Sequence, residues 1–194
     1  MKHPVIILAA ALAVGGAAVA AQHAAADAPA AAPQQASGAG IVHGHADIAG
    51  EGISGTAEFT ESQQGTGKLV TITVTVKGLK PGMHGVHLHA VGKCTPDFAA
   101  AGGHFDPGPA GNMDPDANHP YHMGDLPQLA ATGPTAAMRV ATTRVTLSDG
   151  PLSLFDADGS AIVIHGNPDQ GITGESKSGV SGGPRIACGV IEKK

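Results

Sequence analysis

The clearest pattern along the chain is an alternation of apolar and polar side chains between residues 70 and 76. Val70, Ile72, Val74 and Val76 share one parity, and threonines occupy the positions between them. Successive side chains of a β-strand point to opposite faces, so this period of two predicts a strand with one buried face. We expect the segment to form a sheet edge of the core and exclude a helix.

Further short segments rich in β-forming residues are bounded by glycines and other turn residues. Strands are expected at residues 45–49, 55–60, 83–91, 138–147, 161–165 and 185–191. The predicted fold class is therefore all-β, an antiparallel Greek-key β-sandwich or flattened barrel of about eight strands. Residues 92–128 and 166–183 lack periodicity, and irregular segments of this length are often functional, so we expect two long functional loops.

The first twenty residues have the features of a secretory signal peptide. Lys2 precedes a short apolar run at residues 5–14, and small residues lead to an A-x-A ending at Ala20. The run is shorter than the roughly 20 apolar residues that span a membrane. Residues 21–40 are almost all Ala, Pro, Gln, Gly and Ser and predict a disordered tether, which leaves the domain at residues 41–194. The expected location is periplasmic or secreted, with cleavage after Ala20 or after Ala26.

Charge indicates which partners to expect. The formal net charge is -5, and no run of Lys or Arg offers a basic surface. Because nucleic acids and anionic membranes bind basic surfaces, neither is an expected partner. A small substrate fits better than a polymer, and both a monomer and a homodimer remain open.

The two cysteines, Cys94 and Cys188, are far apart in the sequence. In an oxidising compartment such a pair most simply forms one disulfide, and two thiols that bind a metal are the alternative.

Histidines are the most informative residues of the chain. His84, His87 and His89 fall in one predicted strand, whose parity puts His87 and His89 on one face and His84 on the other. Two imidazoles from one face can share copper or zinc. We expect His84 to be a hydrogen-bonded structural residue.

More potential ligands follow in the irregular segment. His104, His119, His122 and Asp125 lie there, and His165 ends an apolar strand. Nitrogen and oxygen ligands in such a set suit zinc. His43 and His45 begin the domain, where a solvated strand start is favoured over capture of a metal.

Five segments occur in the order seen in copper/zinc superoxide dismutases, a family that the chain resembles from about residue 45 to residue 191. They are residues 85–89 (GVHLH), 101–107 (AGGHFDP), 122–126 (HMGDL), 162–165 (IVIH) and 185–191 (RIACGVI). The resemblance implies conversion of the superoxide anion into dioxygen and hydrogen peroxide at a copper ion, with a zinc ion beside it.

The resemblance also implies the ligands of both metals. Copper would be bound by His87, His89, His104 and His165, and His104 would bridge copper to zinc. Zinc would be completed by His122, Asp125 and one further histidine. The family has that histidine eight or nine residues after the bridging one, where this chain has Asn112 and Met113. His119 is the nearest substitute.

Other roles follow from the same resemblance. Asp169 would link ligand histidines of the two metals by hydrogen bonds. Cys94 and Cys188 would form the family's disulfide. Arg185 would hold the anion beside copper, and His104 would couple proton movement to electron transfer. Apart from the resemblance, Lys177 is a candidate for steering the substrate from a longer distance, and a solvated surface lysine is the alternative.

Three other functions fit parts of the pattern. An exported copper-binding carrier or storage protein on the same fold would keep the histidines without needing Arg185. A non-catalytic relative would lack copper ligands that this chain retains. A zinc hydrolase is disfavoured because no general base stands beside a three-ligand set with an open position.

Overall fold

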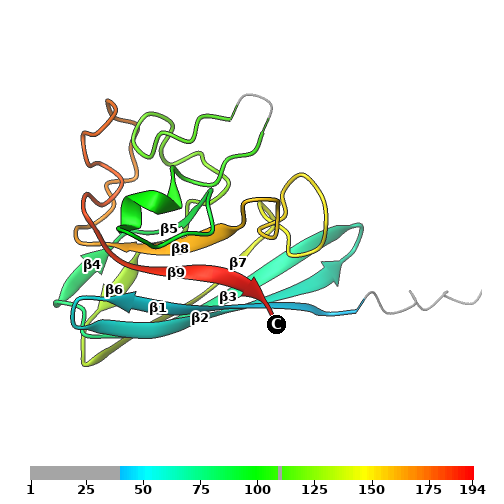
Figure 1. Ribbon diagram of the computed structural model, residues 1–194, viewed down its shortest axis with the longest axis horizontal. Coiled ribbons are helices and arrows are strands. Elements are labelled where there is room, and N and C mark those ends of the chain that lie inside the picture. The colour runs from blue at the N-terminus through cyan, green and yellow to red at the C-terminus, as the bar shows by residue number, and fades with distance from the viewer. Residues whose placement is uncertain (1–39, 109–110) are drawn as a thin grey trace, which may run out of the picture. The chain divides into compact units, whose positions relative to one another are not determined.

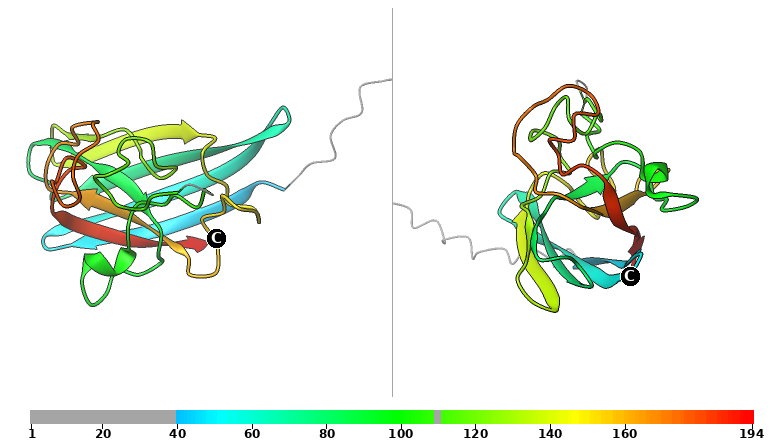
Figure 2. Two further views of the ribbon diagram at one scale, coloured as in Figure 1. Left: turned by 90° about the horizontal axis from the view of Figure 1, so that it is seen from above. Right: turned by 90° about the vertical axis from the view of Figure 1, so that its left-hand side faces the viewer.

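The computed structural model describes residues 40–108 and 111–194. The expected signal segment and nearly all of the expected tether lie outside these residues. The described domain is built on a seven-stranded antiparallel sheet that curls strongly toward a barrel (Figures 1 and 2). Its one helix, within the described ranges, is the 3-10 turn η1 (Phe98–Ala101). None of the described helical structure is long and apolar enough to cross a membrane.

The large sheet has the strand order β5-β8-β9-β1-β2-β3-β7. Its strands are β1 (Val42–Gly50), β2 (Ile53–Gln64), β3 (Gly67–Lys77), β5 (Val86–His89), β7 (Thr135–Thr142), β8 (Ser160–His165) and β9 (Arg185–Lys193). A second, two-stranded sheet pairs β4 (Gly82–His84) with β6 (Leu129–Ala131). The all-β prediction is therefore confirmed.

The alternating segment at residues 70–76 forms most of β3. Its four apolar side chains are fully buried, as the period of two predicts. The expected position at a sheet edge was wrong, because β3 pairs with β2 on one side and with β7 on the other. Alternation reports which face of a strand is buried, but it does not report how many neighbours the strand has.

The single strand expected at residues 83–91 is divided at Gly85. The Gly85 amide donates to the Asn167 carbonyl at 3.0 Å, and its own carbonyl accepts from the His165 amide at 2.9 Å. The chain thereby passes from the small sheet into the large one. His84 stays in the small sheet, where its Nδ1 lies 2.8 Å from the His165 carbonyl oxygen and its Nε2 lies 2.9 Å from that of Lys80. Its structural role is confirmed.

The strand expected at residues 138–147 ends early, at Thr142. Val145 and Leu147 are buried beyond that end, so the apolar pattern continues without a strand. The Glu61 carboxylate takes the place of a neighbouring strand there, since it accepts from the amides of Leu147 at 2.6 Å and Ser148 at 3.1 Å. The short strand β6 was not predicted.

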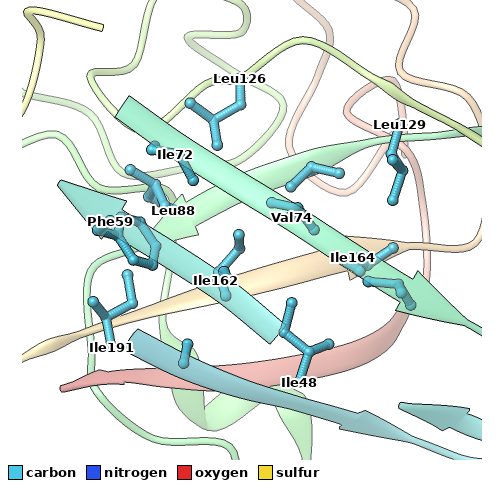
Figure 3. Close-up of a cluster of buried hydrophobic side chains, with 14 of the residues drawn as sticks. Ile48, Phe59, Ile72, Val74, Leu88, Leu126, Leu129, Ile162, Ile164 and Ile191 are labelled. Carbon is cyan, nitrogen blue, oxygen red and sulfur yellow. The ribbon is translucent and has the colours of Figure 1, made fainter. Parts of the chain in front are cut away.

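The main core lies inside the curled sheet (Figure 3). Phe59, Ile72, Leu88 and Ile162 are among the buried side chains that fill it. Leu126, from the irregular segment, packs against the same cluster. Deleting a large side chain here, as in Ile162→Ala, would cost about 2–5 kcal/mol of unfolding free energy.

The opposite face of β8 is also covered. Ala161 and Val163 pack there with Ala101 and Cys188, against the partly buried Phe98. Every residue of β5 and of β8 is therefore buried. Polar side chains on this covered face of the sheet are removed from water. His87 and His89 of β5, two of the candidate ligands, lie on this face.

Candidate metal centre

The centre is built on β5, on the end of β8 and on the two long irregular segments. Val86 and Leu88 point into the main core, so the alternation of the strand sends His87 and His89 to the opposite face. The irregular segment is attached to β5 by main-chain bonds, since the Leu88 amide donates to the Gly124 carbonyl and the Leu88 carbonyl accepts from the Phe105 amide, each at 2.9 Å. These bonds bring His104 and Asp125 beside the strand.

Four histidines expected to bind copper form one buried group. A ring nitrogen from each of His87, His89, His104 and His165 lies within 4.8 Å of the others. The His165 side chain joins the group at a register shift that follows Ile164, where β8 ends. The sequence placed these residues in three separate segments, and the structure brings them together.

Each of the four histidines offers one ring nitrogen that has no hydrogen-bond partner among the described residues. These atoms are His87 Nδ1, His89 Nε2, His104 Nε2 and His165 Nε2. A buried polar atom without a partner is costly, so four that converge on one point fit the coordination of a metal ion. Imidazole nitrogens suit copper, and the set fits that ion.

In three of these histidines the other ring nitrogen is held in place. His87 Nε2 lies 2.9 Å from Asp169 Oδ2. His89 Nδ1 lies 3.0 Å from the Gly102 carbonyl oxygen, and His165 Nδ1 lies 3.0 Å from that of Gly183. An acceptor on the far nitrogen keeps the proton there and leaves the lone pair on the inward nitrogen.

A second group surrounds Asp125. One carboxylate oxygen lies 2.7 Å from His104 Nδ1, and the other lies 2.9 Å from His122 Nδ1 and 3.3 Å from His119 Nδ1. Ligand atoms of His104, His119, Asp125 and also His87 lie within 4.8 Å of one another. The imidazoles of His104, His119 and His122 with the carboxylate of Asp125 make a nitrogen and oxygen donor set of the kind that binds zinc.

The two nitrogens of His104 face different groups of potential ligands. Its Nε2 points into the first group and its Nδ1 into the second. Its ring lies 4.1 Å from that of His87 and 4.8 Å from that of His122, centroid to centroid. His104 therefore lies between the two groups, as a bridging ligand would.

His119, the proposed substitute, points into the centre. Its side chain is 1% exposed. Its Nε2 lies 2.7 Å from Asp169 Oδ1, and its Nδ1 has no hydrogen-bond partner within the described part of the chain. Asp169 thus contacts one histidine from each group, as the family resemblance implied.

The protonation of the centre follows from burial and charge. Burial lowers the pKa of His87 and of His104 to about 4, although each contacts an aspartate, and it lowers the pKa of His165 to about 3. It also lowers the pKa of His89 well below the ordinary value. These imidazoles are therefore neutral at neutral pH, the form that binds metals.

The second group behaves differently. Burial lowers the pKa of His119, but its contacts with the carboxylates of Asp125 and Asp169 outweigh burial and raise that pKa to about 9. Burial raises the pKa of both aspartates, and contacts with histidines outweigh this effect and hold the two values well below the usual range. Without a metal, His119 carries a proton between two carboxylates.

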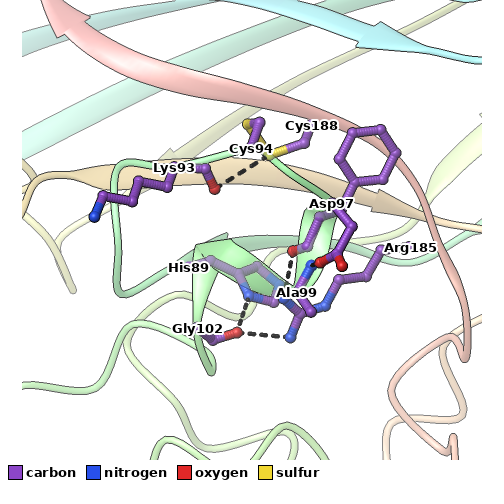
Figure 4. Close-up of a disulfide and its surroundings, with 9 residues drawn as sticks. His89, Lys93, Cys94, Asp97, Ala99, Gly102, Arg185 and Cys188 are labelled. Carbon is purple, nitrogen blue, oxygen red and sulfur yellow. Dashed lines mark hydrogen bonds between the residues drawn. A yellow bond between two sulfur atoms is a disulfide. The ribbon is translucent and has the colours of Figure 1, made fainter.

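Arg185 lies at the start of β9, beside the first group (Figure 4). Its guanidinium donates to the Phe98 carbonyl at 2.7 Å and to the Gly102 carbonyl at 2.6 Å. The Gly102 carbonyl is also the contact of His89. Arg185, His165 and Lys177 line one cavity of about 380 Å³, so both cations border a single opening to the site.

Cys94 and Cys188 form a disulfide that joins the segment before η1 to β9 (Figure 4). This confirms the expected pairing and excludes a pair of thiols that bind metal.

His43 and His45 lie on β1, outside both groups of ligands. His45 Nδ1 lies 2.9 Å from Glu58 Oε1, and its Nε2 lies 3.1 Å from Asp47 Oδ1. His43 Nδ1 lies 3.3 Å from the Thr60 hydroxyl. These contacts agree with a strand start at the surface.

Supporting residues of the centre were not found from the sequence. Gln128 Oε1 accepts from the Asp169 amide at 3.0 Å. Arg144 donates to the carbonyls of Tyr121 and His122. Asp116 is buried among backbone donors of the second irregular segment. All three act across long sequence separations, and no local motif marks them.

Comparisons with known proteins agree with this geometry. A family model described as copper/zinc superoxide dismutase (SODC) matches residues 53–191. The chain is 41% identical over 146 residues to "Superoxide dismutase [Cu-Zn] 2" of Brassica juncea, covering 73% of this chain and 90% of the relative. It is 40% identical over 152 residues to "Superoxide dismutase [Cu-Zn]" of Caulobacter vibrioides, covering 74% and 82%.

Solved structures with the same fold include two relatives. The clock protein EA4 matches with a TM-score of 0.58 and 27% identity, covering 77% of this chain and 92% of that one. A double mutant of a SOD-like protein from Bacillus subtilis matches with a TM-score of 0.58 and 32% identity, covering 75% and 95%.

Proposed function

The chain belongs to the copper/zinc superoxide dismutase family, and we propose that it converts two superoxide anions and two protons into one dioxygen and one hydrogen peroxide. The observation that carries this proposal is the convergence, beside Arg185, of four buried imidazole nitrogens that have no hydrogen-bond partner among residues 40–108 and 111–194. A binding site for copper needs the nitrogens alone. A cation at the opening adds a place for an anionic substrate.

The donor sets suggest which residues hold each metal. Copper would be held by His87, His89, His104 and His165. Zinc would be held by His104, His119, His122 and Asp125. We assign His87 to copper because its Nδ1 is one of the four converging nitrogens, and His122 to zinc because its Nδ1 lies 2.9 Å from Asp125. When bound, copper supplies the two one-electron steps that superoxide undergoes.

The protein's part begins with the substrate. Superoxide is a small anion, so Arg185 would hold it by charged hydrogen bonds beside the first histidine group. The carbonyls of Phe98 and Gly102 fix the guanidinium in that position. Lys177, on the same cavity, would add to the attraction at longer range.

Protons are handled by His104. Its Nε2 has no hydrogen-bond partner among the described residues and faces the other copper ligands, so this atom would accept a proton when it is not bound to copper and would pass that proton to the reduced substrate. The contact of Nδ1 with Asp125 holds the ring in place during that transfer. The second proton would come from water in the cavity.

Export is also proposed. The signal-like residues 1–20, the composition of residues 21–40 and the bacterial relative support a periplasmic or secreted protein. A disulfide across the domain is consistent with an oxidising compartment.

The function is tested by the decay of superoxide in the presence of the mature chain loaded with copper and zinc, compared with equal copper held by a chelator. Decay well above the chelator control is expected. No excess decay despite bound copper in the four-histidine site would reject the enzyme and favour a carrier or storage protein. The variant His165→Ala should lose both copper and activity.

A further inference from the structure

The two irregular segments lie side by side over the outer face of the sheet (Figure 1). We call residues 92–128 the metal loop, since they carry most of the second ligand group, and residues 166–183 the entrance loop, since they border the substrate cavity. Asp169 of the entrance loop contacts His119 of the metal loop beside the two ligand groups. A second connection lies farther along both loops, at Asp116.

Asp116 belongs to the metal loop, but its carboxylate serves the entrance loop. One oxygen accepts from the Gly179 amide at 2.9 Å. The other accepts from the Ser181 amide at 3.1 Å and from the Ser181 hydroxyl at 2.8 Å. The residue is 4% exposed, so these bonds lie away from water, where an ionised acceptor binds its donors most strongly.

The main chain of Asp116 makes another contact with the entrance loop. Its carbonyl accepts from the Gly174 amide at 2.9 Å. One residue therefore holds the entrance loop at position 174 and again at 179–181. The segment between these points contains Lys177, which has φ 65° and is the one described residue other than glycine with a positive φ. A residue other than glycine keeps a positive φ when the surrounding structure holds it there.

The segment held by Asp116 shapes the opening to the site. Lys177, Gly179 and Ser181 line the cavity that also contains His165 and Arg185. If the segment moved, Lys177 would leave its place on the approach of the anion. The ligand histidines would keep their own contacts.

Asp116 is also connected to the second ligand group. The Asp114 side chain accepts from the Asp116 amide at 3.0 Å, and the Asp114 carbonyl lies 3.0 Å from His122 Nε2. A continuous path of hydrogen bonds therefore leads from His122 through residues 114–116 to the entrance loop. A metal that orders His122 would order this path as well.

We propose that Asp116 is a positioning residue that fixes residues 174–181, and with them Lys177, at the mouth of the substrate cavity, and that it transmits zinc binding to this segment. The role in substrate capture rests on the proposed function. The mechanical connection between the loops does not, because it requires only the contacts of Asp116.

The first test is hydrogen exchange of the protein with zinc alone, which has no redox activity. In Asp116→Asn an amide group would face N–H donors in place of one oxygen, so the amides of residues 174–181 should exchange at least tenfold faster than in the parent chain. Ser181→Ala, which removes one of the three side-chain bonds, should give a smaller acceleration and serves if Asp116→Asn fails to fold.

Asp106→Asn is the matched control. Asp106 is another buried aspartate of the metal loop, but it accepts from Asn112 and Asn118 of its own loop. Exchange at residues 174–181 should be unchanged in this variant. Unchanged exchange in Asp116→Asn, or equal acceleration in both variants, would overturn the proposal.

Two further measurements test the coupling. Zinc should slow exchange at residues 174–181 in the parent chain and should do so much less in Asp116→Asn; an equal effect in both would refute the transmission. In the fully loaded protein, Asp116→Asn should lower kcat/KM for superoxide severalfold and weaken its dependence on salt, with copper content unchanged. If no form of the chain decays superoxide, the dismutase proposal fails, while the exchange results still decide the role of Asp116.

Discussion

His87 and His119 share one carboxylate: Asp169 places one oxygen 2.9 Å from His87 Nε2 and the other 2.7 Å from His119 Nε2. His119 is the residue that we propose in place of a zinc ligand that the family carries elsewhere in its sequence. The shared carboxylate holds both rings with their Nδ1 atoms turned inward. An acceptor on the far nitrogen fixes the orientation of a ligand ring, so Asp169 orients His119 in the same way as it orients His87.

Asp169→Asn should therefore weaken zinc binding. An amide has one acceptor oxygen and can satisfy one of the two histidines. We expect a loss of about 10- to 100-fold in zinc affinity, measured by competition with a chromogenic chelator. Asp158→Asn, at an exposed aspartate outside both ligand groups, should bind zinc as the parent chain does. An unaltered affinity in Asp169→Asn would show that His119 is oriented by other contacts.

Zinc affinity should depend on pH through His119. In the metal-free protein its pKa is about 9, so the ring is protonated at neutral pH. Zinc needs the lone pair, and binding must therefore release this proton. Because binding releases one proton from His119, the zinc affinity should rise about tenfold for each pH unit until the pH reaches about 9. Calorimetry in buffers of different ionisation enthalpy should detect the released proton, and binding without release would contradict the assignment of His119 as a ligand.

The metal-free domain should be most stable near pH 6–7. The folded pKa of His87 and His104 is about 4, below the ordinary value of 6.5, so their contribution is present above pH 6.5 and is lost as the pH falls toward 4. The contribution of His119 to stability depends on pH in the opposite direction. Its folded pKa of about 9 contributes stability that is complete below pH 6.5 and is lost as the pH rises through 9. Urea unfolding at pH 5, 6.5 and 8.5 should show the maximum, and stability that rises steadily to pH 8.5 would contradict it.

Much of the centre could be predicted from the sequence, because its first ligands follow local rules. Strand parity put His87 and His89 on one face, and an apolar run identified β8 ahead of His165. The break at Gly85 and the early end of β7 were missed. Both depend on hydrogen bonds to distant residues, such as Asn167 at Gly85 and Glu61 beyond β7. The role of Asp116 was not predicted for the same reason, since the amides that donate to its carboxylate lie more than sixty residues away in the sequence.

Arg185→Ala should keep copper and slow turnover. The Arg185 guanidinium contacts two carbonyls, and the candidate copper ligands are four histidines, so the variant keeps all of these ligands. Losing the charge beside the site should lower kcat/KM on the order of tenfold at low ionic strength. Arg185→Lys keeps a charge but loses the paired donors, so its kcat/KM should lie between the values of the parent chain and of Arg185→Ala. Normal turnover in the alanine variant, with copper content verified by metal analysis, would remove Arg185 from substrate binding.

The disulfide should matter more to the metal loop than to the core. It anchors the segment before η1 to β9, and this segment leads to the carbonyls of Phe98 and Gly102 that hold Arg185 (Figure 4). Closing a loop of this length stabilises the fold by about 4–5 kcal/mol in the chain-entropy model. In Cys188→Ser, hydrogen exchange should accelerate most at residues 93–102 and least in β2 and β3, whose pairing is continuous from Ser54 to Gln64 in β2 and over all of β3. Equal acceleration in all these segments would show that the bridge stabilises the domain as a whole and does not act specifically on the segment that positions Arg185.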